Sequence, residues 1–300
     1  MLVLVLLFLA VFVYVLNPVR KMRYDYQNGK PVVVGIIGDS IACGYRANNW
    51  EKIEEVIAPV KENGRITQAT QNDIRIGGWA QQLQAWLKQR NQNSIVHNFC
   101  GSGWTTRMVL ERESVKKLAR MTPKPAVVFI SLATNDRLKD ERNVGPEVVA
   151  QFSEYAMNLK TICQQCKYYG MEPVLVKEIN EPLPAGDGWE AAEYHRSKQN
   201  LKMKHHAYSE YIQVVEEVAR NNMFFGSTLF VVDVYSSSLN KGNYPIYKDK
   251  LKGAAPSDFR SDLYAMDATK IFDPIHPNQK GHDLILNQYK KFFLTKWWWY

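Results

Sequence analysis

Short apolar runs alternate with longer amphipathic segments along most of the chain. The runs are rich in β-branched residues and end at turn-forming residues, so each predicts a strand buried on both faces. The five runs are residues 32–37, 94–99, 125–132, 172–177 and 228–234. Buried strands that alternate with helices predict a parallel sheet with helices on both faces. The pattern therefore predicts an α/β fold, a three-layer α/β/α sandwich around a five-stranded parallel sheet.

The segments between these runs predict the helices of the outer layers. In the segment 78–90, for example, Trp79, Leu83 and Leu87 fall on one face at helical spacing. The predicted helices are residues 78–90, 146–169, 190–222 and 279–296. Two polar stretches, 46–76 and 236–272, carry no clear period, and we expect them to be irregular insertions and loops.

The first 16 residues are uninterrupted apolar sequence. A bilayer span needs roughly 17–20 apolar residues, and residues 1–19 come close to that length. Basic residues follow this run rather than precede it, and no small-x-small cleavage site follows, so an uncleaved hydrophobic anchor helix fits better than a signal peptide or a buried helix. We therefore expect residues 1–24 to form a membrane anchor or signal-like segment and residues 25–300 to form the domain. Residues 25–300 alone are expected to stay soluble and active.

The net charge of +8 suggests attraction to anionic surfaces, and does not indicate nucleic acid. The Lys and Arg residues are scattered, and no basic helix with interleaved aromatics appears. The basic residues at 20–23 would place the domain in the cytosol by the positive-inside rule, so the side of the membrane stays open at this point.

The four cysteines are too few for a disulfide framework in a chain of this length. Cys163 and Cys166 have CxxC spacing, but they fall inside a predicted helix and no second Cys or His pair completes a zinc site. We expect buried thiols rather than a metal or redox site.

Two polar motifs together supply the serine, histidine and carboxylate that are needed to activate a serine nucleophile. Ser40 directly follows the first predicted strand, in Gly38-Asp39-Ser40, and His276 lies before the last predicted helix. Asp273 stands three residues before His276, where a turn could bring its carboxylate to the imidazole. Taken singly, these residues are equally typical of helix caps and turns. All of them follow strands or precede the last helix, where an open α/β sheet places its ligand crevice.

Two further residues could stabilise an oxyanion. Asn135 follows the third predicted strand, and its side-chain amide is a hydrogen-bond donor. Gly103 follows the second strand and offers a backbone N–H with no side chain beside it. Ordinary turn roles are the alternative for both.

Four blocks in this order resemble the SGNH/GDSL hydrolase family. Gly38-Asp39-Ser40 matches the first block, with Ile41 in place of the usual Leu, and Gly103 matches the second. The third block has Ala133 in place of a glycine before Thr134-Asn135-Asp136, and the fifth reads Asp273 to Asn278. Cys100 stands where many relatives have another glycine, so its thiol is expected near the pocket. The resemblance spans roughly residues 32–289.

The resemblance implies a flavodoxin-like SGNH fold and a serine esterase mechanism. Ser40 would attack a carbonyl carbon, His276 would transfer the proton, and Asp273 would orient His276. The N–H groups of Ser40 and Gly103 and the amide of Asn135 would bind the oxyanion. The mechanism needs no metal and no organic cofactor.

Several substrates and two rival functions remain compatible with this sequence. An O-acetylated or otherwise short-acylated glycan is the first candidate, and a lipid, lysophospholipid or thioester with a longer chain is the second. An O-acyltransferase and a catalytically inactive binding protein are the alternatives. The family analogy favours a location outside the cytosol, and no pattern indicates an oligomeric state.

Overall fold

The fold was analysed in a computed structural model, which describes residues 17–48, 53–54, 57–62, 65–70, 74–137, 148–179, 208–221, 228–239, 264–266 and 272–296. The described strands are β1 (Val33–Gly38), β2 (Ile53–Glu54), β3 (Ile57–Glu62), β4 (Arg65–Thr70), β5 (Ile74–Arg75), β6 (Ile95–Cys100), β7 (Val127–Ser131), β8 (Glu172–Lys177), β9 (Phe230–Asp233), β10 (Tyr264–Met266) and β11 (Phe272–Pro277). The described helices are α2 (Pro18–Gln27), α3 (Ser40–Cys43), α4 (Trp79–Arg90), α5 (Thr106–Glu111), α6 (Ser114–Ala119), α8 (Val148–Tyr168), α10 (Tyr208–Asn221), α11 (Tyr235–Leu239) and α12 (Gln279–Leu294).

A five-stranded parallel sheet forms the centre of the domain, as the apolar runs predict. The strand order is β6-β1-β7-β8-β9, and each neighbouring pair is parallel. The chain leaves β1 for β6 on one side of it and then crosses to β7 on the other side. The order therefore reverses at β1, which is where open α/β sheets place their ligand crevice.

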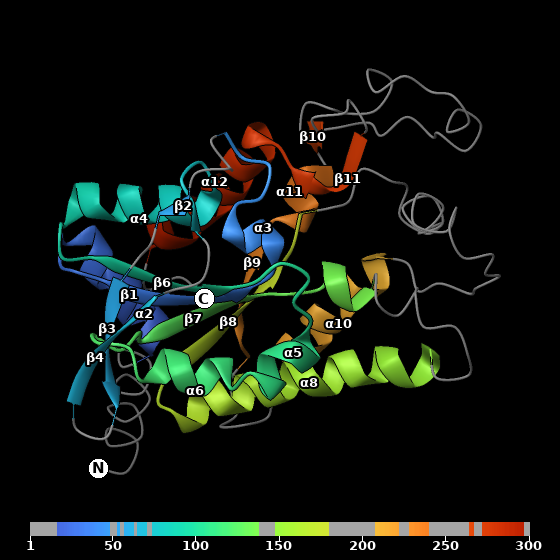
Figure 1. Cartoon of the computed structure of the whole chain (residues 1–300), viewed down its shortest axis with the longest axis horizontal. Coiled ribbons are helices and arrows are strands. Elements are labelled where there is room, and N and C mark those ends of the chain that lie inside the picture. The colour runs from blue at the N-terminus through green and yellow to red at the C-terminus, as the bar shows by residue number, and fades with distance from the viewer. Residues whose placement is uncertain are drawn as a thin grey trace, which may run out of the picture.

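Helices cover both faces of this sheet because successive strand residues point to opposite sides (Figure 1). On one face, Val34, Ile36 and Phe129 pack with α2, α4 and α12. On the other, Ile37 and Ile130 pack with α5, α6, α8 and α10. The sandwich predicted from the sequence is therefore present in the described residues.

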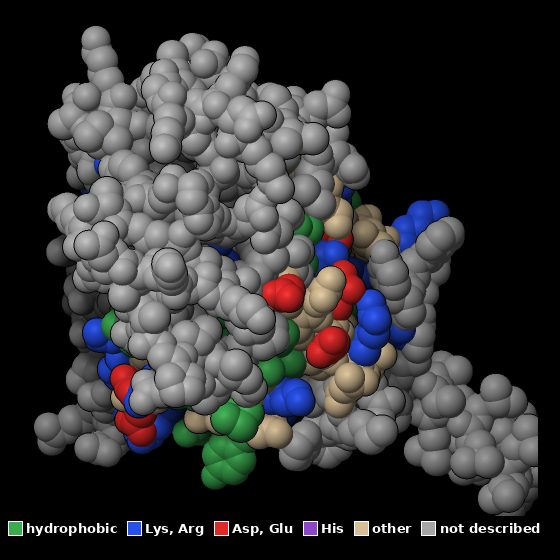
Figure 2. Space-filling view, turned by 90° about the vertical axis from the view of Figure 1, so that its right-hand side faces the viewer, with side chains coloured by type: hydrophobic (Ala, Val, Ile, Leu, Met, Phe, Trp, Pro, Cys, Tyr) green, Lys and Arg blue, Asp and Glu red, His purple; other side chains and the backbone are tan. Residues whose placement is uncertain are grey.

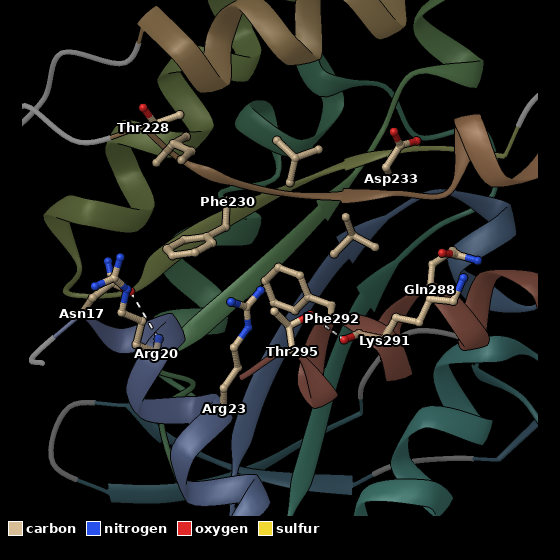
Figure 3. A pocket seen from close by; sticks show the side chains of 13 residues that line it. Asn17, Arg20, Arg23, Thr228, Phe230, Asp233, Gln288, Lys291, Phe292 and Thr295 are labelled. Atoms are coloured by element: carbon tan, nitrogen blue, oxygen red, sulfur yellow. Dashed lines mark hydrogen bonds between the residues drawn. The ribbon is translucent and has the colours of Figure 1, made fainter. Parts of the chain in front are cut away.

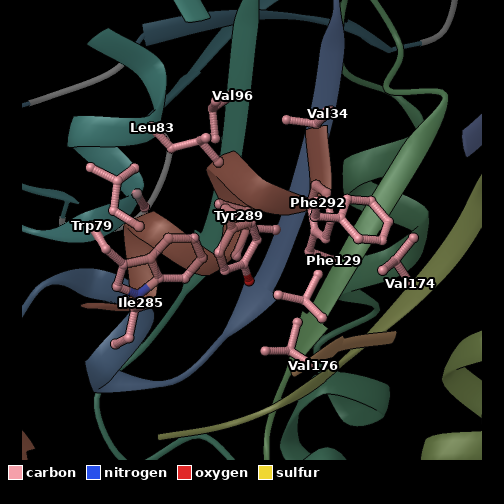
Figure 4. Close-up of a cluster of buried hydrophobic side chains, with 14 of the residues drawn as sticks. Val34, Trp79, Leu83, Val96, Phe129, Val174, Val176, Ile285, Tyr289 and Phe292 are labelled. Carbon is pink, nitrogen blue, oxygen red and sulfur yellow. The ribbon is translucent and has the colours of Figure 1, made fainter. Parts of the chain in front are cut away.

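Aromatic side chains fill the centre of the first of these two cores (Figure 4). The rings of Trp79 and Tyr289 are stacked with centroids 4.4 Å apart, and Phe129 meets Tyr289 edge to face at 4.9 Å. Trp79 begins α4 and Tyr289 belongs to α12, so this stack joins two helices that lie far apart in the sequence. It also fixes α12, whose first turn follows His276.

Helix α2 corrects the boundary that we expected at residue 24. Asn17 caps this helix by accepting hydrogen bonds from the N–H groups of Val19 and Arg20, and Pro18 occupies the first turn, where its missing N–H costs nothing. Val19 and Met22 are buried in the core beneath it. Residues 18–24 therefore belong to the domain, and a truncation that keeps the core intact begins before Asn17.

Residues 1–16, the expected anchor helix, lie outside the described residues. In the part of the chain that the structure describes, no helix is both long and apolar enough for a transmembrane span.

The stretch 46–76, expected to be irregular, contains two antiparallel strand pairs. β2 pairs with β5, and β3 pairs with β4 in a register that sets Glu62 opposite Arg65. The two residues between β3 and β4 are Asn63-Gly64, the dipeptide most typical of a two-residue hairpin. In the stretch 236–272, also expected to be irregular, the structure describes the end of α11, strand β10 and the first residue of β11, and the rest lies outside the described residues.

The predicted helices differ from the observed ones mainly at their ends. α4, α8 and α12 end within two residues of the predicted limits. Of the long helix expected over residues 190–222, the structure describes α10, and residues 190–207 lie outside the described residues.

Acidic and basic side chains lie next to one another on the described surface in Figure 2, so the net positive charge is not gathered into one patch on that side.

Candidate active site

Three strands of the central sheet end at the point where the strand order reverses, and each delivers one predicted site residue. Ser40 follows β1, Gly103 lies three residues after β6, and Asn135 lies four residues after β7. Because parallel strands share the direction of their carboxyl ends, these three residues come to one edge of the sheet.

Ser40 is the first residue of α3, and the short link from β1 places it there. Gly38 ends β1 without a side chain, since a Cβ at this position would lie 2.4 Å from the Cβ of Ala42. Asp39 then caps α3 by accepting a hydrogen bond of 2.8 Å from the N–H of Ile41. The Ser40 side chain is buried, with 3% of its surface exposed.

The imidazole of His276 lies within hydrogen-bonding distance of the Ser40 hydroxyl. The distance between Nε2 of His276 and Oγ of Ser40 is 2.9 Å, although 236 residues separate the two in sequence. A neutral imidazole with its proton on Nδ1 accepts the Ser40 proton at Nε2, which is the arrangement a general base requires. The ring of Tyr45 stacks against the imidazole at a centroid distance of 5.6 Å.

The backbone before His276 differs from the turn that we expected. Residues 272–277 form strand β11, which pairs antiparallel with β10, so His276 is delivered by an extended segment. The expected turn is therefore wrong. The side chain of Asp273 lies outside the described residues, and its role as the partner of His276 remains a prediction from the sequence.

Asn135 is held at this edge by the carboxylate of Asp39. Its Nδ2 atom donates a hydrogen bond of 3.3 Å to Oδ2 of Asp39. A side-chain amide carries two N–H groups, so one remains for an acyl oxygen. Asp39 therefore links the nucleophile helix to the amide donor, a role that we did not predict for it.

Further buried carboxylates support the helical turn, residues 134–137, that carries Asn135. Glu178 accepts hydrogen bonds from the hydroxyl groups of Ser131 and Thr134, at 2.9 and 3.2 Å. Asp136 accepts from the N–H and the hydroxyl of Thr106 at the start of α5. These bonds connect the end of β7 to β8 and α5 and so restrict the movement of Asn135.

Burial raises the pKa of Asp39 well above its usual range, and the nearby Glu178 carboxylate raises it further. The hydrogen bonds from the N–H groups of Ile41 and Ala42 oppose this shift, since they favour the ionised form. Burial also raises the pKa of Glu178. Two buried carboxyl groups of this kind do not both ionise readily, and a neutral member reduces the negative charge behind the place where an oxyanion would form.

The loop after β6 is shaped by two glycines. Gly103 has a φ of +72°, which L-residues with a side chain rarely adopt, and the space beside its Cα is open. A Cβ at Gly101 would lie only 2.0 Å from the indole nitrogen of Trp104. Gly103 therefore has no side chain of its own that would cover its N–H group.

The structure corrects the expectation that Cys100 carries a thiol near the pocket. Cys43, the last residue of α3, and Cys100, the last residue of β6, form a disulfide with their Cα atoms 5.5 Å apart. Their proximity follows from the sheet register, which sets Gly38 opposite Cys100. Asn98 adds a second link between β6 and α3, since its side-chain amide donates to the carbonyl of Ala42 at 2.9 Å.

Cys163 and Cys166 are free and buried, as we expected for this pair. Burial raises the pKa of the Cys163 thiol to about 12, which keeps it protonated. Among the described residues, no cluster of His, Cys, Asp and Glu side chains is arranged to hold a metal ion.

Comparison with known proteins decides the family. The model of the GDSL-like lipase/acylhydrolase family matches residues 36–284. The chain belongs to this family. As a GDSL-like acylhydrolase, it is a carboxylic ester hydrolase.

Solved structures with the same fold include an acetylxylan esterase and an α/β-hydrolase enzyme. An acetylxylan esterase from Geobacillus stearothermophilus is 15% identical, with a TM-score of 0.52 over 89% of this chain and 95% of that chain. An α/β-hydrolase enzyme from the metagenome of Lake Arreo, Spain, is 19% identical, with a TM-score of 0.53 over 89% of this chain and 98% of that chain. Among curated protein sequences, none matches this chain.

The disulfide of this GDSL-like acylhydrolase gives a prediction for stability. The Cys43→Ala/Cys100→Ala variant is expected to lose about 4 kcal/mol of unfolding free energy, because the bond closes a loop with a sequence separation of 57 residues. Thermal unfolding with and without reductant measures this. Reductant should lower the melting temperature of the wild type to that of the variant and leave the variant unchanged. A wild-type melting temperature that does not respond, in protein whose Cys43 and Cys100 are shown to be reduced, would contradict the prediction.

Proposed function

We propose that the chain hydrolyses a short-chain acyl ester, in the first place an O-acetyl group on a glycan, with Ser40 as the nucleophile. The observation that carries the proposal is the 2.9 Å distance from Oγ of Ser40 to Nε2 of His276 at the carboxyl edge of a parallel sheet. A hydroxyl at this distance from an imidazole can be deprotonated as it attacks.

The reaction follows from the positions of these groups. Oγ of Ser40 attacks the carbonyl carbon while Nε2 of His276 takes the hydroxyl proton. The N–H groups of Ser40 and Gly103 and the amide of Asn135 stabilise the oxyanion. His276 then gives the proton to the leaving alcohol, which leaves an acyl group on Ser40. Water attacks this acyl-enzyme with His276 again as the base, and the acid is released.

Asp273 is proposed to accept a hydrogen bond from Nδ1–H of His276. Such a carboxylate holds the imidazole in the tautomer that leaves Nε2 free to take a proton. It also stabilises the imidazolium that forms when Ser40 attacks.

The preference for a short acyl group is supported by the structural neighbours. The neighbour from Geobacillus stearothermophilus is an acetylxylan esterase, and two structures of that protein are catalytic mutants in which a serine or a histidine is replaced. Ser40 and His276 are the same two residue types. The identity of 15–17% supports a shared fold, and the substrate class is carried over as part of this proposal.

A second candidate is an ester with a long acyl chain, such as a lipid or lysophospholipid. The apolar run over residues 1–16 favours it, because an anchored enzyme would meet its substrate at the membrane surface. An O-acyltransferase, which passes the acyl group to another hydroxyl instead of water, would use the same acyl-enzyme.

We further propose that the chain is anchored in a membrane by the apolar residues 1–16, which precede helix α2, with the domain outside the cytosol. Disulfides form and persist mainly in oxidising compartments, and the Cys43–Cys100 bond supports that location. The basic residues at 20–23 favour the opposite orientation by the positive-inside rule. Arg20 and Arg23 are buried in the domain, however. They therefore have a role in the fold in addition to any role as a topology signal.

Hydrolysis of p-nitrophenyl acetate, butyrate and palmitate by the full chain tests the acyl preference. We expect kcat/KM to be highest for acetate and to fall with chain length. An acetylated xylan or other O-acetylated glycan should then release acetate. A maximum at palmitate would replace the short-chain proposal with the lipid one, while hydrolysis of none of the esters would favour a transferase.

A further inference from the structure

A pocket of about 600 Å³ lies along the outer edge of the central sheet (Figure 3). Neither Ser40 nor His276 lines it. It is lined by residues of α2, by β9, which is the last described strand of the sheet, and by the second half of α12. Gln288 is the first residue of α12 to line it, nine residues after the start of the helix. At a rise of 1.5 Å per residue, about 14 Å of helix separates Gln288 from the first residue of α12, which lies close to His276 in the sequence.

Three cationic side chains surround this pocket. Arg20 and Arg23 come from α2, and Lys291 comes from α12. The pocket also contains one acidic residue, Asp233, but its carboxylate is paired with Lys177 at 2.6 Å. The lining is therefore positive on balance, and it favours an anion.

The two arginines are built into the wall of the pocket. Arg20 is 8% exposed and Arg23 is 1% exposed, so the little surface that they retain is not that of freely solvated side chains. The guanidinium of Arg23 lies 4.2 Å from the ring centre of Phe292 and 5.2 Å from that of Phe230. Figure 3 shows it between these two rings, with Arg20 on one side and Lys291 on the other. The rings fix the guanidinium in place, so little conformational entropy is lost when a ligand binds.

The geometry points to a binding site for a phosphoryl group carried on a small organic body. The planar guanidinium fork matches phosphate oxygens, and a lysine adds a second positive charge. A pocket of this size exceeds the needs of a lone anion, and the phenyl rings supply an apolar surface for the rest of the ligand. Neither the family nor the ester chemistry assigns a ligand to this edge of the sheet.

Two sources could supply the phosphoryl group, namely the headgroup of an anionic phospholipid or a soluble phosphate ester. The sequence favours the lipid source, because the apolar run of residues 1–16 directly precedes Asn17, which lines the pocket. If that run enters a bilayer, the pocket is tied to the headgroup region by only a few residues.

Thermal unfolding of the full chain in a non-ionic detergent tests the proposal. One arm adds inorganic phosphate against chloride at equal ionic strength. The other adds phosphatidylglycerol to the micelles against uncharged diacylglycerol. We expect phosphatidylglycerol to raise the melting temperature by about 3 °C, because a ligand that binds the folded state stabilises it by mass action.

The Arg20→Gln/Lys291→Gln variant should lose this rise while it keeps the rate of ester hydrolysis. The matched control, Lys88→Gln/Lys160→Gln, removes two exposed lysines and the same charge elsewhere, and it should respond like the wild type. If the double variant does not fold, the single variant Lys291→Gln replaces it, because Lys291 is exposed. In this variant, the rise in melting temperature should be no more than half of the wild-type rise.

The outcomes distinguish the two sources of the phosphoryl group from each other, and both of them from the absence of a binding site. A rise with phosphatidylglycerol alone identifies the lipid headgroup, and a rise with inorganic phosphate as well shows that the phosphoryl group itself is recognised. A rise with phosphate alone identifies a soluble phosphate ester. No rise in either arm, or an equal rise in the pocket variant, would overturn the proposal. None of these results depends on ester hydrolysis.

Discussion

Replacement of Ser40 by alanine is expected to lower kcat for p-nitrophenyl acetate by about 10⁴-fold or more, which corresponds to about 5 kcal/mol of transition-state stabilisation. Without Oγ there is no acyl-enzyme, and any remaining turnover must come from direct attack of water. The small change in volume at a buried serine should leave the fold intact, and thermal unfolding checks this. Steady-state kinetics on the purified full chain measures the loss.

The His276→Ala variant and the Ser40→Ala/His276→Ala double variant test whether the two residues act as a unit. Nucleophile and base contribute to one step, so the double variant should be about as slow as either single variant. The Lys88→Gln variant, at an exposed position far from the site, is the control and should keep full activity. Losses that multiply in the double variant would show that Ser40 and His276 act independently.

Replacement of Asn135 by alanine is expected to lower kcat by about 10²–10³-fold with little change in KM. An oxyanion donor acts mainly on the transition state, and the removal of one donor typically has an effect of this size. The remaining donors, the N–H groups of Ser40 and Gly103, would still be present. Kinetics with the acetate ester measures kcat and KM separately.

The Asn135→Asp variant is a matched control, because it keeps the shape of the side chain and removes the N–H donors. It also adds another carboxyl group to the cluster of Asp39, Asp136 and Glu178, so its activity should be no higher than that of the alanine variant. A loss in kcat of less than about threefold in Asn135→Ala would rule out the amide as an oxyanion donor. A rise in KM with an unchanged kcat would instead make Asn135 a substrate-binding residue.

The sheet could be predicted from the sequence because its strands are continuous apolar runs. A strand buried on both faces needs apolar side chains at successive positions. This signal is strong even in a short stretch such as residues 174–177 (VLVK) of β8. Strands β3 and β4 contain no continuous apolar run. Their polar and apolar residues also alternate only weakly, so the alternation typical of a half-buried strand is missing too. The local signal for this pair is the Asn63-Gly64 dipeptide between them, which is typical of a two-residue connection.

The start of the domain was harder to predict because apolar residues on both sides of Asn17 suggest one continuous segment. Asn17-Pro18 is a typical helix start, and that local signal takes precedence over the average hydropathy. Val19 and Met22 then face the core of the domain.

At the site, the polar residues were predicted and their connections were not. Ser40, Gly103 and Asn135 each follow a strand, and this position could be inferred from the chain order alone. The bond between Cys43 and Cys100 depends on the register of β1 against β6, which the sequence does not reveal. The contact between Asp39 and Asn135 depends on the same kind of long-range placement, since 96 residues separate them.

Labelling with an organophosphonate active-site probe tests the central claim most directly. The full chain is treated with a p-nitrophenyl phosphonate, and the adduct is located by intact mass and peptide mapping. The expected result is one adduct per chain on Ser40, no adduct in Ser40→Ala, and labelling slowed by more than about 100-fold in His276→Ala, because the imidazole activates the hydroxyl. An adduct on another residue, or labelling of Ser40 at the wild-type rate without His276, would contradict the assignment of Ser40 and His276 as nucleophile and base.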